Sequence, residues 1–183
     1  MLDLLEMQKY FILRHLKKGE TAVDFTMGNG YDTEFLCRSV GETGRVYAFD
    51  IQKQAIESTA ARLAASDCPR VYTLIHDSHH NAKNYVLGPI KAGMFNLGYL
   101  PGGDKRITTM RETTMPAIED AISLLDSDGV LTVAIYPGHA EGDAEGNMIH
   151  EYLSTLPRWR YCATELRILN SPTSPYFMII EKK

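Results

Sequence analysis

Short apolar runs alternate with helix-like segments along most of the chain, and this alternation restricts the fold more than any other feature. Five runs with strand character span residues 21–25, 45–51, 71–76, 92–97 and 130–138, and a helical segment separates each from the next. Strands that alternate with helices form a parallel sheet covered on both faces, because each crossover is right-handed. We therefore predict an α/β protein with a mostly parallel sheet.

The remaining segments complete this prediction. Helices are expected at residues 1–18, 32–40, 51–65, 79–86, 107–125 and 145–156, and Pro116 is expected to kink or break the fifth of them. The last two runs, 161–169 and 176–182, have no helix between them, so we expect an antiparallel hairpin at one edge of the sheet. Residues 1–183 are expected to form a single domain on which the amphipathic helix 1–18 packs.

Composition favours an ordinary globular protein of the cytoplasm and excludes few functions. The formal net charge is -4, so no global positive field indicates a nucleic-acid partner, although a local basic patch can still bind RNA. The 3 cysteines are scattered without a Cys-x-x-Cys spacing, which argues against a disulfide framework and a zinc site. The charged start of the chain differs from a secretory signal, and no apolar stretch approaches the about 20 residues needed to span a bilayer.

A glycine turn, MGNG, follows the first predicted strand in the stretch VDFTMGNGYDT. Gly28 and Gly30 permit backbone conformations closed to other residues and a close approach of a ligand, and the next helix offers free amide groups to an anion. Asp32 either belongs to this site or is a plain N-cap of that helix. Asp50 ends the second strand and follows Gly30 by 20 residues, the approximate spacing at which a carboxylate reaches ribose hydroxyls in nucleotide-binding sheets.

The third strand ends in HDSHH. Asp77 and Ser78 stand where an adenine edge would lie if Asp50 binds a ribose. Adjacent helical residues point in different directions, which argues against a metal site at the histidine pair. We expect His79 to contact the cofactor and His80 to lie on the surface.

Two further strand ends read FNLGYLPGGD and IYPGH, and with them the chain resembles a known family. VDFTMGNGYDT, AFDIQ and HDSHH are typical of class I S-adenosylmethionine-dependent methyltransferases. NLGYLPGGD together with YPGH is specific to a narrower group, the YtqB-type rRNA methylases. That group includes the tRNA methyltransferase that acts on 5-aminomethyl-2-thiouridine at the wobble position. The resemblance covers nearly the whole chain.

The resemblance implies a Rossmann-like fold with a seven-stranded sheet, and S-adenosyl-L-methionine as the cofactor. It places the methionine part of the cofactor against the glycine turn, the ribose on Asp50 and the adenosine between Ile51 and Gln52. One departure is Thr26, where the superfamily usually has glycine; its side chain either narrows the turn or adds a hydroxyl contact. The expected cofactor contacts are Thr26, Met27, Gly28, Asn29, Gly30, Asp32, Asp50, Ile51, Gln52, Asp77, Ser78 and His79.

The resemblance also places the methyl acceptor above the fourth strand end. Asn96 is expected to accept a hydrogen bond from an amine and direct its lone pair, and Tyr99 to stack on a base. Asp104 or His139 is expected to receive the proton. The alternative is that Asn96 caps a turn and Tyr99 only packs. The glycines at 98, 102 and 103 leave room for a base.

A local basic group near this loop, Lys105, Arg106 and Arg111, either meets tRNA phosphates or is an ordinary solvated face. The leading hypothesis is an S-adenosylmethionine-dependent enzyme that methylates the wobble aminomethyl group of tRNA. rRNA or a small molecule is the alternative substrate. A nicotinamide-dependent oxidoreductase is disfavoured because the third glycine of G-x-G-x-x-G is missing, and a non-catalytic adaptor because the motifs are intact. No metal and no membrane partner is expected, and a homodimer is left open.

Overall fold

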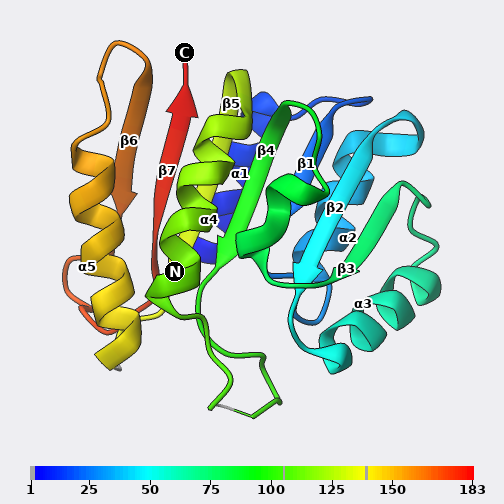
Figure 1. Ribbon diagram of the computed structural model, residues 1–183, viewed down its shortest axis with the longest axis horizontal. Helices are drawn as coiled ribbons and strands as arrows, with labels where there is room; N and C mark the ends of the chain where they lie inside the picture. The colour runs from blue at the N-terminus through cyan, green and yellow to red at the C-terminus, as the bar shows by residue number, and fades with distance from the viewer. Residues whose placement is uncertain (1–2, 105, 139) are drawn as a thin grey trace.

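The computed structural model describes residues 3–104, 106–138 and 140–183, and a seven-stranded sheet lies at its centre (Figure 1). The strand order is β3-β2-β1-β4-β5-β7-β6, with parallel pairing from β3 to β5 and antiparallel pairing of β7 with both neighbours. The predicted parallel sheet and its closing antiparallel hairpin are thus confirmed. The strands are Thr21–Asp24 (β1), Arg45–Asp50 (β2), Tyr72–His76 (β3), Ile90–Asn96 (β4), Leu125–Ile135 (β5), Tyr161–Leu166 (β6) and Tyr176–Lys182 (β7).

Helices cover both faces of this sheet. The α-helices α1, α2 and α3 pack on one face, and α4, α5 and the 3-10 helix η2 pack on the other (Figure 1). Within the described ranges, no helix is both long enough and apolar enough to cross a membrane. The helical elements are Leu4–His15 (α1), Tyr31–Val40 (α2), Gly41–Thr43 (η1), Lys53–Ala65 (α3), His79–Asn84 (η2), Arg111–Leu124 (α4) and Ala140–Ser154 (α5).

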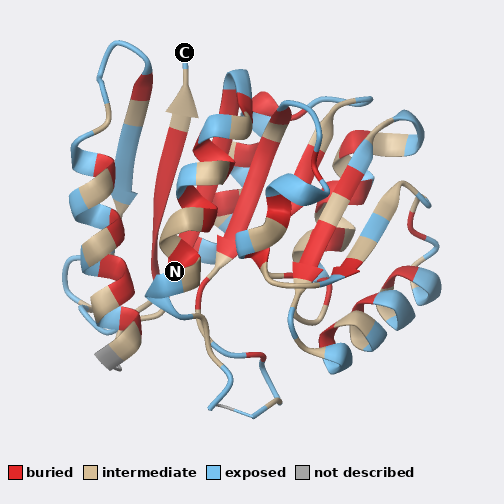
Figure 2. Cartoon of the chain, viewed as in Figure 1, coloured by how far each residue is buried: buried red, intermediate tan, exposed pale blue. Residues whose placement is uncertain are grey.

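The core lies in two layers, one on each side of the central strands (Figure 2). Successive strand residues point to opposite faces, so Ala22 belongs to the layer under α1 and α2 while Val23 belongs to the layer under α4 and α5. In the second layer the rings of Phe25 and Phe95 stack in parallel with centroids 4.2 Å apart. This stack joins the ends of β1 and β4, next to which the site residues lie.

The expected start of α4 is wrong, and of the kink or break expected at Pro116 only the kink stays a prediction. The helix begins at Arg111 rather than at residue 107, because Thr109 N donates to Gly98 O at 2.9 Å and Tyr99 forms a bridge with Thr108. These contacts hold the preceding residues in an extended conformation. The helix is continuous through Pro116, so the expected break is absent from the described helix. Pro116 is the sixth residue of α4, so the backbone hydrogen bond that it removes lies near the helix start.

Several other boundaries differ from the expectation, among them those of β5, α5 and η2. Strand β5 begins at Leu125 rather than at residue 130, because Leu125 pairs with Ile90 ahead of a bulge in the β4–β5 ladder. Helix α5 begins at Ala140 rather than at residue 145. The short helix after β3 is a 3-10 helix that ends at Asn84 rather than at residue 86.

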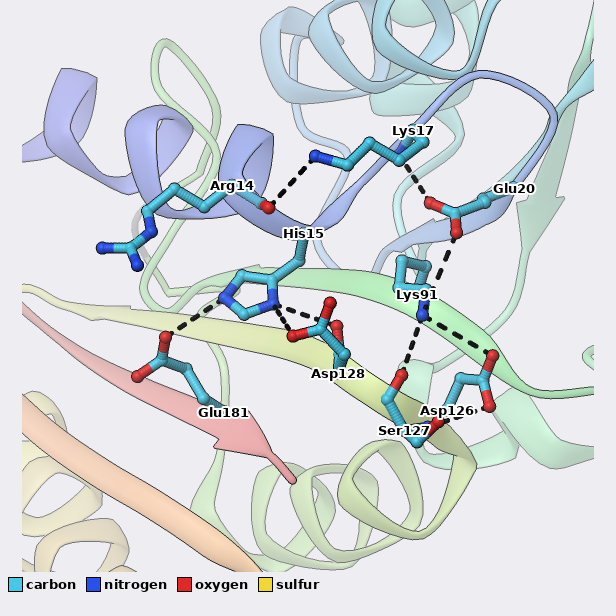
Figure 3. Close-up of polar contacts among 9 residues, drawn as sticks. All are labelled: Arg14, His15, Lys17, Glu20, Lys91, Asp126, Ser127, Asp128 and Glu181. Carbon is cyan, nitrogen blue, oxygen red and sulfur yellow. Dashed lines mark hydrogen bonds and ion pairs between the residues drawn. The ribbon is translucent and has the colours of Figure 1, made fainter.

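A polar cluster ties α1 to the amino-terminal edge of β4 and β5 (Figure 3). His15 Nδ1 lies 2.9 Å from Asp128 O, and His15 Nε2 lies 3.1 Å from Glu181 Oε1 on β7. Both ring nitrogens therefore lie within hydrogen-bond distance of an acceptor oxygen. Lys91 Nζ, nearby, donates to Ser127 O at 2.8 Å. The cluster fixes α1 at the end of the sheet opposite to the candidate site.

Candidate active site

The sheet has a topological switch point at the carboxyl ends of β1 and β4. Strand β1 lies between β2 and β4, and the chain moves outward in opposite directions on its two sides. In open α/β sheets ligands bind in the crevice beyond such a point. The segments after β1 and β4 are in direct contact, since Asn96 N donates to Thr26 Oγ1 at 2.7 Å. The Thr26 hydroxyl thus joins the two segments, and its expected contact with the cofactor stays a prediction.

The glycine turn between β1 and α2 is tight. Gly30 has φ +81°, and its amide donates to Met27 O at 2.7 Å. A Cβ at Gly30 would lie 2.9 Å from Thr59 Cγ2, so the turn packs directly against α3. Gly30 itself occupies the N-cap position of α2, and Asp32 is the second residue of the helix. The reading of Asp32 as an N-cap is therefore wrong.

Asp50 lies beneath this turn. Its Oδ2 accepts from Gly28 N at 3.1 Å and its Oδ1 accepts from Gln52 N at 2.9 Å. Burial raises the pKa of the Asp50 carboxyl. Because a carboxylate has about four acceptor sites, Asp50 can receive further hydrogen bonds from a diol. The structure thus brings together the glycine turn and the acidic residue that sequence spacing had paired.

Asp77 and Ser78 organise the turn after β3. Asp77 accepts from Asn81 Nδ2 at 3.0 Å and from Tyr85 OH at 2.8 Å, and the bond from Asn81 in particular lowers its pKa. Ser78 Oγ accepts from His80 N at 3.3 Å and so caps η2. Asn81 and Tyr85 were not singled out from the sequence, because their partner depends on the shape of η2.

His79 is buried, whereas His80 is exposed. His79 Nδ1 donates to Phe25 O at 3.2 Å, and the ring packs edge-on against Phe95. Burial lowers the pKa of His79 to about 4, so the ring is neutral at physiological pH. With the proton on Nδ1, Nε2 is an acceptor that has no hydrogen-bond partner within the described residues.

Asn96 is fixed by a second acidic residue. Its Nδ2 donates to Asp32 Oδ2 at 2.5 Å, across 64 positions of sequence. Burial raises the pKa of Asp32. Since the amide nitrogen is bound to Asp32, the carbonyl oxygen Oδ1 is the atom that Asn96 can offer to a donor in the site.

Asp24, at the end of β1, is a further carboxyl group that sequence reasoning missed. It is fully buried, and its oxygens accept from Thr33 Oγ1 at 2.6 Å and from Thr26 N at 3.1 Å. Burial, and secondly the charge on Asp32, raise the pKa of Asp24 to about 7. A polar residue that closes an apolar strand before a glycine turn is the signal that was available for it.

The β4–α4 loop, residues 97–110 without the undescribed position 105, folds back onto the glycine turn. Leu100 is buried with Met27, and its Cδ1 lies 3.6 Å from the position of a Cβ on Gly28. Asn29 Nδ2 donates to Pro101 O at 3.2 Å. Tyr99 is partly exposed on the same loop. The two glycine-rich segments of the sequence therefore form one site.

Asp104 and the basic residues lie on the outer part of this loop. Asp104 is exposed and forms a bidentate pair with Arg106, which holds its pKa below the usual range. Arg111 Nε lies 3.5 Å from Glu141 Oε1. His139 and Lys105, the other residues expected near the acceptor, lie outside the described residues. Across the residues that are described, no group of three or more His, Cys, Asp or Glu could hold a metal ion.

The sheet order, the inserted antiparallel β7 and the glycine turn at the switch point define the class I methyltransferase fold. Residues 46–182 match the family described as "Putative rRNA methylase", and the chain belongs to that family. The resemblance inferred from the motifs is thereby confirmed.

Three relatives illustrate the similarity. A protein from Clostridium thermocellum described as a "putative rRNA-methylase" has 40% identity and a TM-score of 0.96, over 100% of this chain and 99% of that chain. A "putative methyltransferase" from Streptococcus mutans, solved in complex with SAH, has 34% identity and a TM-score of 0.91, over 100% and 99%. The chloroplastic tRNA (mnm(5)s(2)U34)-methyltransferase of Arabidopsis thaliana is 34% identical over 92% of this chain, which spans 65% of that protein's length.

Proposed function

We propose that this protein is an S-adenosylmethionine-dependent RNA methyltransferase whose acceptor is the amino group of 5-aminomethyl-2-thiouridine at the wobble position of tRNA. Family membership supports the reaction class, and the printed activity of the Arabidopsis relative supports the acceptor. The observation that carries the proposal is the Asn96–Asp32 pair beside the glycine turn, because it presents a fixed carbonyl oxygen where an amine can be held.

The residues at the switch point fit the proposed cofactor. The positive φ of Gly28 and Gly30 and the close packing of Gly30 on Thr59 leave backbone rather than side chain at the surface of the turn. Asp50 provides acceptors for ribose hydroxyls, and the segment 77–79 provides the adenine side. The SAH complex of the Streptococcus mutans neighbour supports this assignment. When bound, the cofactor supplies an electrophilic methyl group.

The chain must then hold a neutral amine in the site. An aliphatic amine has a pKa of about 10, so at neutral pH it arrives as an ammonium ion without a lone pair. Asn96 Oδ1 accepts one N–H of the amine and orients it. Asp32 attracts the ammonium ion and receives its proton, directly or through water, since burial already raises the pKa of this carboxyl.

Asp32 is a better proton acceptor than Asp104. The pair with Arg106 lowers the pKa of Asp104, whereas burial raises the pKa of Asp32. His139 remains a candidate from the sequence. On the RNA side, the partly exposed Tyr99 is suited to stacking on a base, and Arg106 and Arg111 to contacts with phosphates.

The location and assembly of the enzyme are further parts of the proposal. A reducing cytoplasm fits the free cysteines Cys37, Cys68 and Cys162. A homodimer would offer RNA a longer surface than one chain, and light scattering with and without tRNA measures the assembly directly.

The test uses methyl-labelled cofactor and tRNA from a strain that lacks the final wobble methylation. Label is expected in that tRNA at the wobble nucleotide. Ribosomal RNA and free aliphatic amines are assayed beside it, because the family description names rRNA. Label in rRNA or in the amine, with none in the tRNA, contradicts the proposed acceptor.

Variants test the role of the Asn96–Asp32 pair. Asn96→Ala and Asp32→Asn are expected to lower kcat by about a hundredfold or more while SAH affinity is retained, because the first removes the group that positions the amine and the second removes the proposed proton acceptor. Asn84→Ala, on the exposed end of η2, is the matched control and should behave as the wild type. Loss of SAH binding in the Asp32 variant would instead make Asp32 a cofactor ligand.

A further inference from the structure

Glu145 on α5 is a buried carboxyl group to which the chemistry above gives no role. Its side chain is 1% exposed, and its oxygens accept hydrogen bonds from two threonine hydroxyls. Thr114 Oγ1 on α4 lies 2.6 Å from Oε1, and Thr109 Oγ1 on the β4–α4 loop lies 2.8 Å from Oε2. A buried carboxylate destabilises a protein unless its oxygens are satisfied, so these hydroxyls are held firmly.

The bond to Glu145 fixes the direction of the Thr109 hydroxyl. A hydroxyl has one proton to donate, and here the proton points to the carboxylate. The lone pairs of Thr109 Oγ1 are then left as acceptors, and Gly98 N donates to this oxygen at 2.9 Å. Gly98, Thr109 and Glu145 thus form a chain of hydrogen bonds that runs from the end of β4 to α5.

This chain closes the base of the β4–α4 loop. Thr109 N also donates to Gly98 O at 2.9 Å, and the next pair outward, Tyr99 and Thr108, forms an antiparallel bridge. Gly98 lies two residues after Asn96 and directly before Tyr99, with φ +143°. Any shift of the Gly98 backbone therefore moves Asn96, which is proposed to hold the amine, and Tyr99, which is proposed to stack on the nucleobase.

We propose that Glu145 is a positioning residue for the RNA acceptor: through the Thr109 hydroxyl it fixes the backbone of Gly98 and so the placement of Asn96 and Tyr99. The proposal rests on the proposed function for its effect on turnover. Its structural part, the fixed loop base, is independent of any reaction. Glu145 lies on α5, outside the glycine turn, so we expect its loss to act mainly on the acceptor half of the site.

A comparison of Thr109 with Thr114 distinguishes this positioning role from a general stabilising role of Glu145. Thr109 and Thr114 bind the same carboxylate with similar distances, but only Thr109 continues to Gly98. Replacement of either threonine by valine keeps the side-chain shape and removes one donor to Glu145. Thr109→Val breaks the link to the loop, whereas Thr114→Val leaves it in place. Thr109→Ser retains the hydroxyl.

The experiment compares Thr109→Val, Thr109→Ser and Thr114→Val in the full chain. For Thr109→Val we expect kcat/KM for the RNA acceptor to fall about tenfold or more, with SAH affinity within about twofold of the wild type. Thr109→Ser and Thr114→Val should retain kcat/KM. Equal losses in the two valine variants would overturn the positioning role and leave Glu145 a stabilising residue.

Amide hydrogen exchange provides the second measurement, which needs no substrate. In Thr109→Val, exchange in residues 97–104 and 106–109 is expected to become about tenfold faster or more, while Thr114→Val leaves these residues unchanged. If the wild type methylates no RNA yet exchange follows this pattern, the proposed function is wrong, but the structural part of the proposal, that Thr109 and Glu145 fix the base of the loop, is supported. Unchanged exchange in Thr109→Val refutes the proposal whatever the activity.

Discussion

Asp24 makes the stability of the fold depend on pH in a direction opposite to that of most carboxyl groups. Its pKa is raised from 3.8 to about 7, chiefly by burial. Below pH 3.8 the carboxyl is protonated in both the folded and the unfolded chain. As pH rises through this value, the unfolded chain loses the proton while the folded protein keeps it, and unfolding becomes more favourable. Above the pKa of the folded state the carboxyl is ionised in both states, and the free energy of unfolding falls no further on its account.

The magnitude follows from the size of the pKa change. At about 1.4 kcal/mol for each pH unit, the free energy of unfolding falls by up to about 4 kcal/mol between about pH 4 and about pH 8. Asp24→Asn abolishes this fall. Its amide reproduces the protonated carboxyl, because Oδ1 can accept from Thr26 N and Nδ2 can donate to Thr33 Oγ1. The variant should match the wild type in acid and exceed it above neutrality.

Urea unfolding of both proteins across this pH range measures the effect, and the difference between them cancels the titration of groups remote from Asp24. Asp67→Asn is the control, because Asp67 is exposed and its positive φ suits asparagine. Parallel stability curves for Asp24→Asn and the wild type would refute the reasoning and show that Asp24 is ionised in the folded protein at neutral pH.

Three further changes test other contacts. Asp50→Ala should weaken SAH binding by about tenfold or more in calorimetry, through lost acceptors for the ribose; unchanged affinity would exclude Asp50 from the cofactor site. Gly30→Ala should lower the free energy of unfolding by about 1–2 kcal/mol because of its positive φ, and Thr59→Ala in the same chain should recover part of this by removing the contact at 2.9 Å. His15→Ala should destabilise the fold by about 1–3 kcal/mol in thermal or urea unfolding by leaving Glu181 without its partner, whereas Arg14→Ala, whose side chain is exposed, should not; equal effects would count against the His15 cluster as an anchor of α1.

The succession of strands and helices along the chain and the glycine turn follow from local patterns, which is why the sequence predicts them. Each strand is a short apolar run, and the turn residues Gly28 and Gly30 follow the first of these runs. The predicted boundaries of helices and strands are wrong where a contact between residues distant in sequence determines them. The start of α4 depends on the pairing of Thr109 with Gly98, and the start of β5 on the pairing of Leu125 with Ile90.

The same distinction between local patterns and distant contacts applies to the site residues. Asp50 and Asn96 were found because each ends an apolar strand, and the sheet brings strand ends to one edge. Their partners were not found, since nothing local relates Asn96 to Asp32 or the loop after β4 to Glu145. Asp24 was passed over because sequence gives no measure of how completely a strand end is covered.

The position of β7 has a consequence for how the protein is made. Residues 176–182 are the last strand of the chain, yet they pair with β5 on one side and β6 on the other. While the chain is being synthesised, the apolar edge of β5 has no partner until these residues leave the ribosome. An unpaired edge of this kind can pair with other chains. The nascent protein therefore depends on rapid closure of the sheet once residues 176–182 have left the ribosome, or on a chaperone that shields β5 until then.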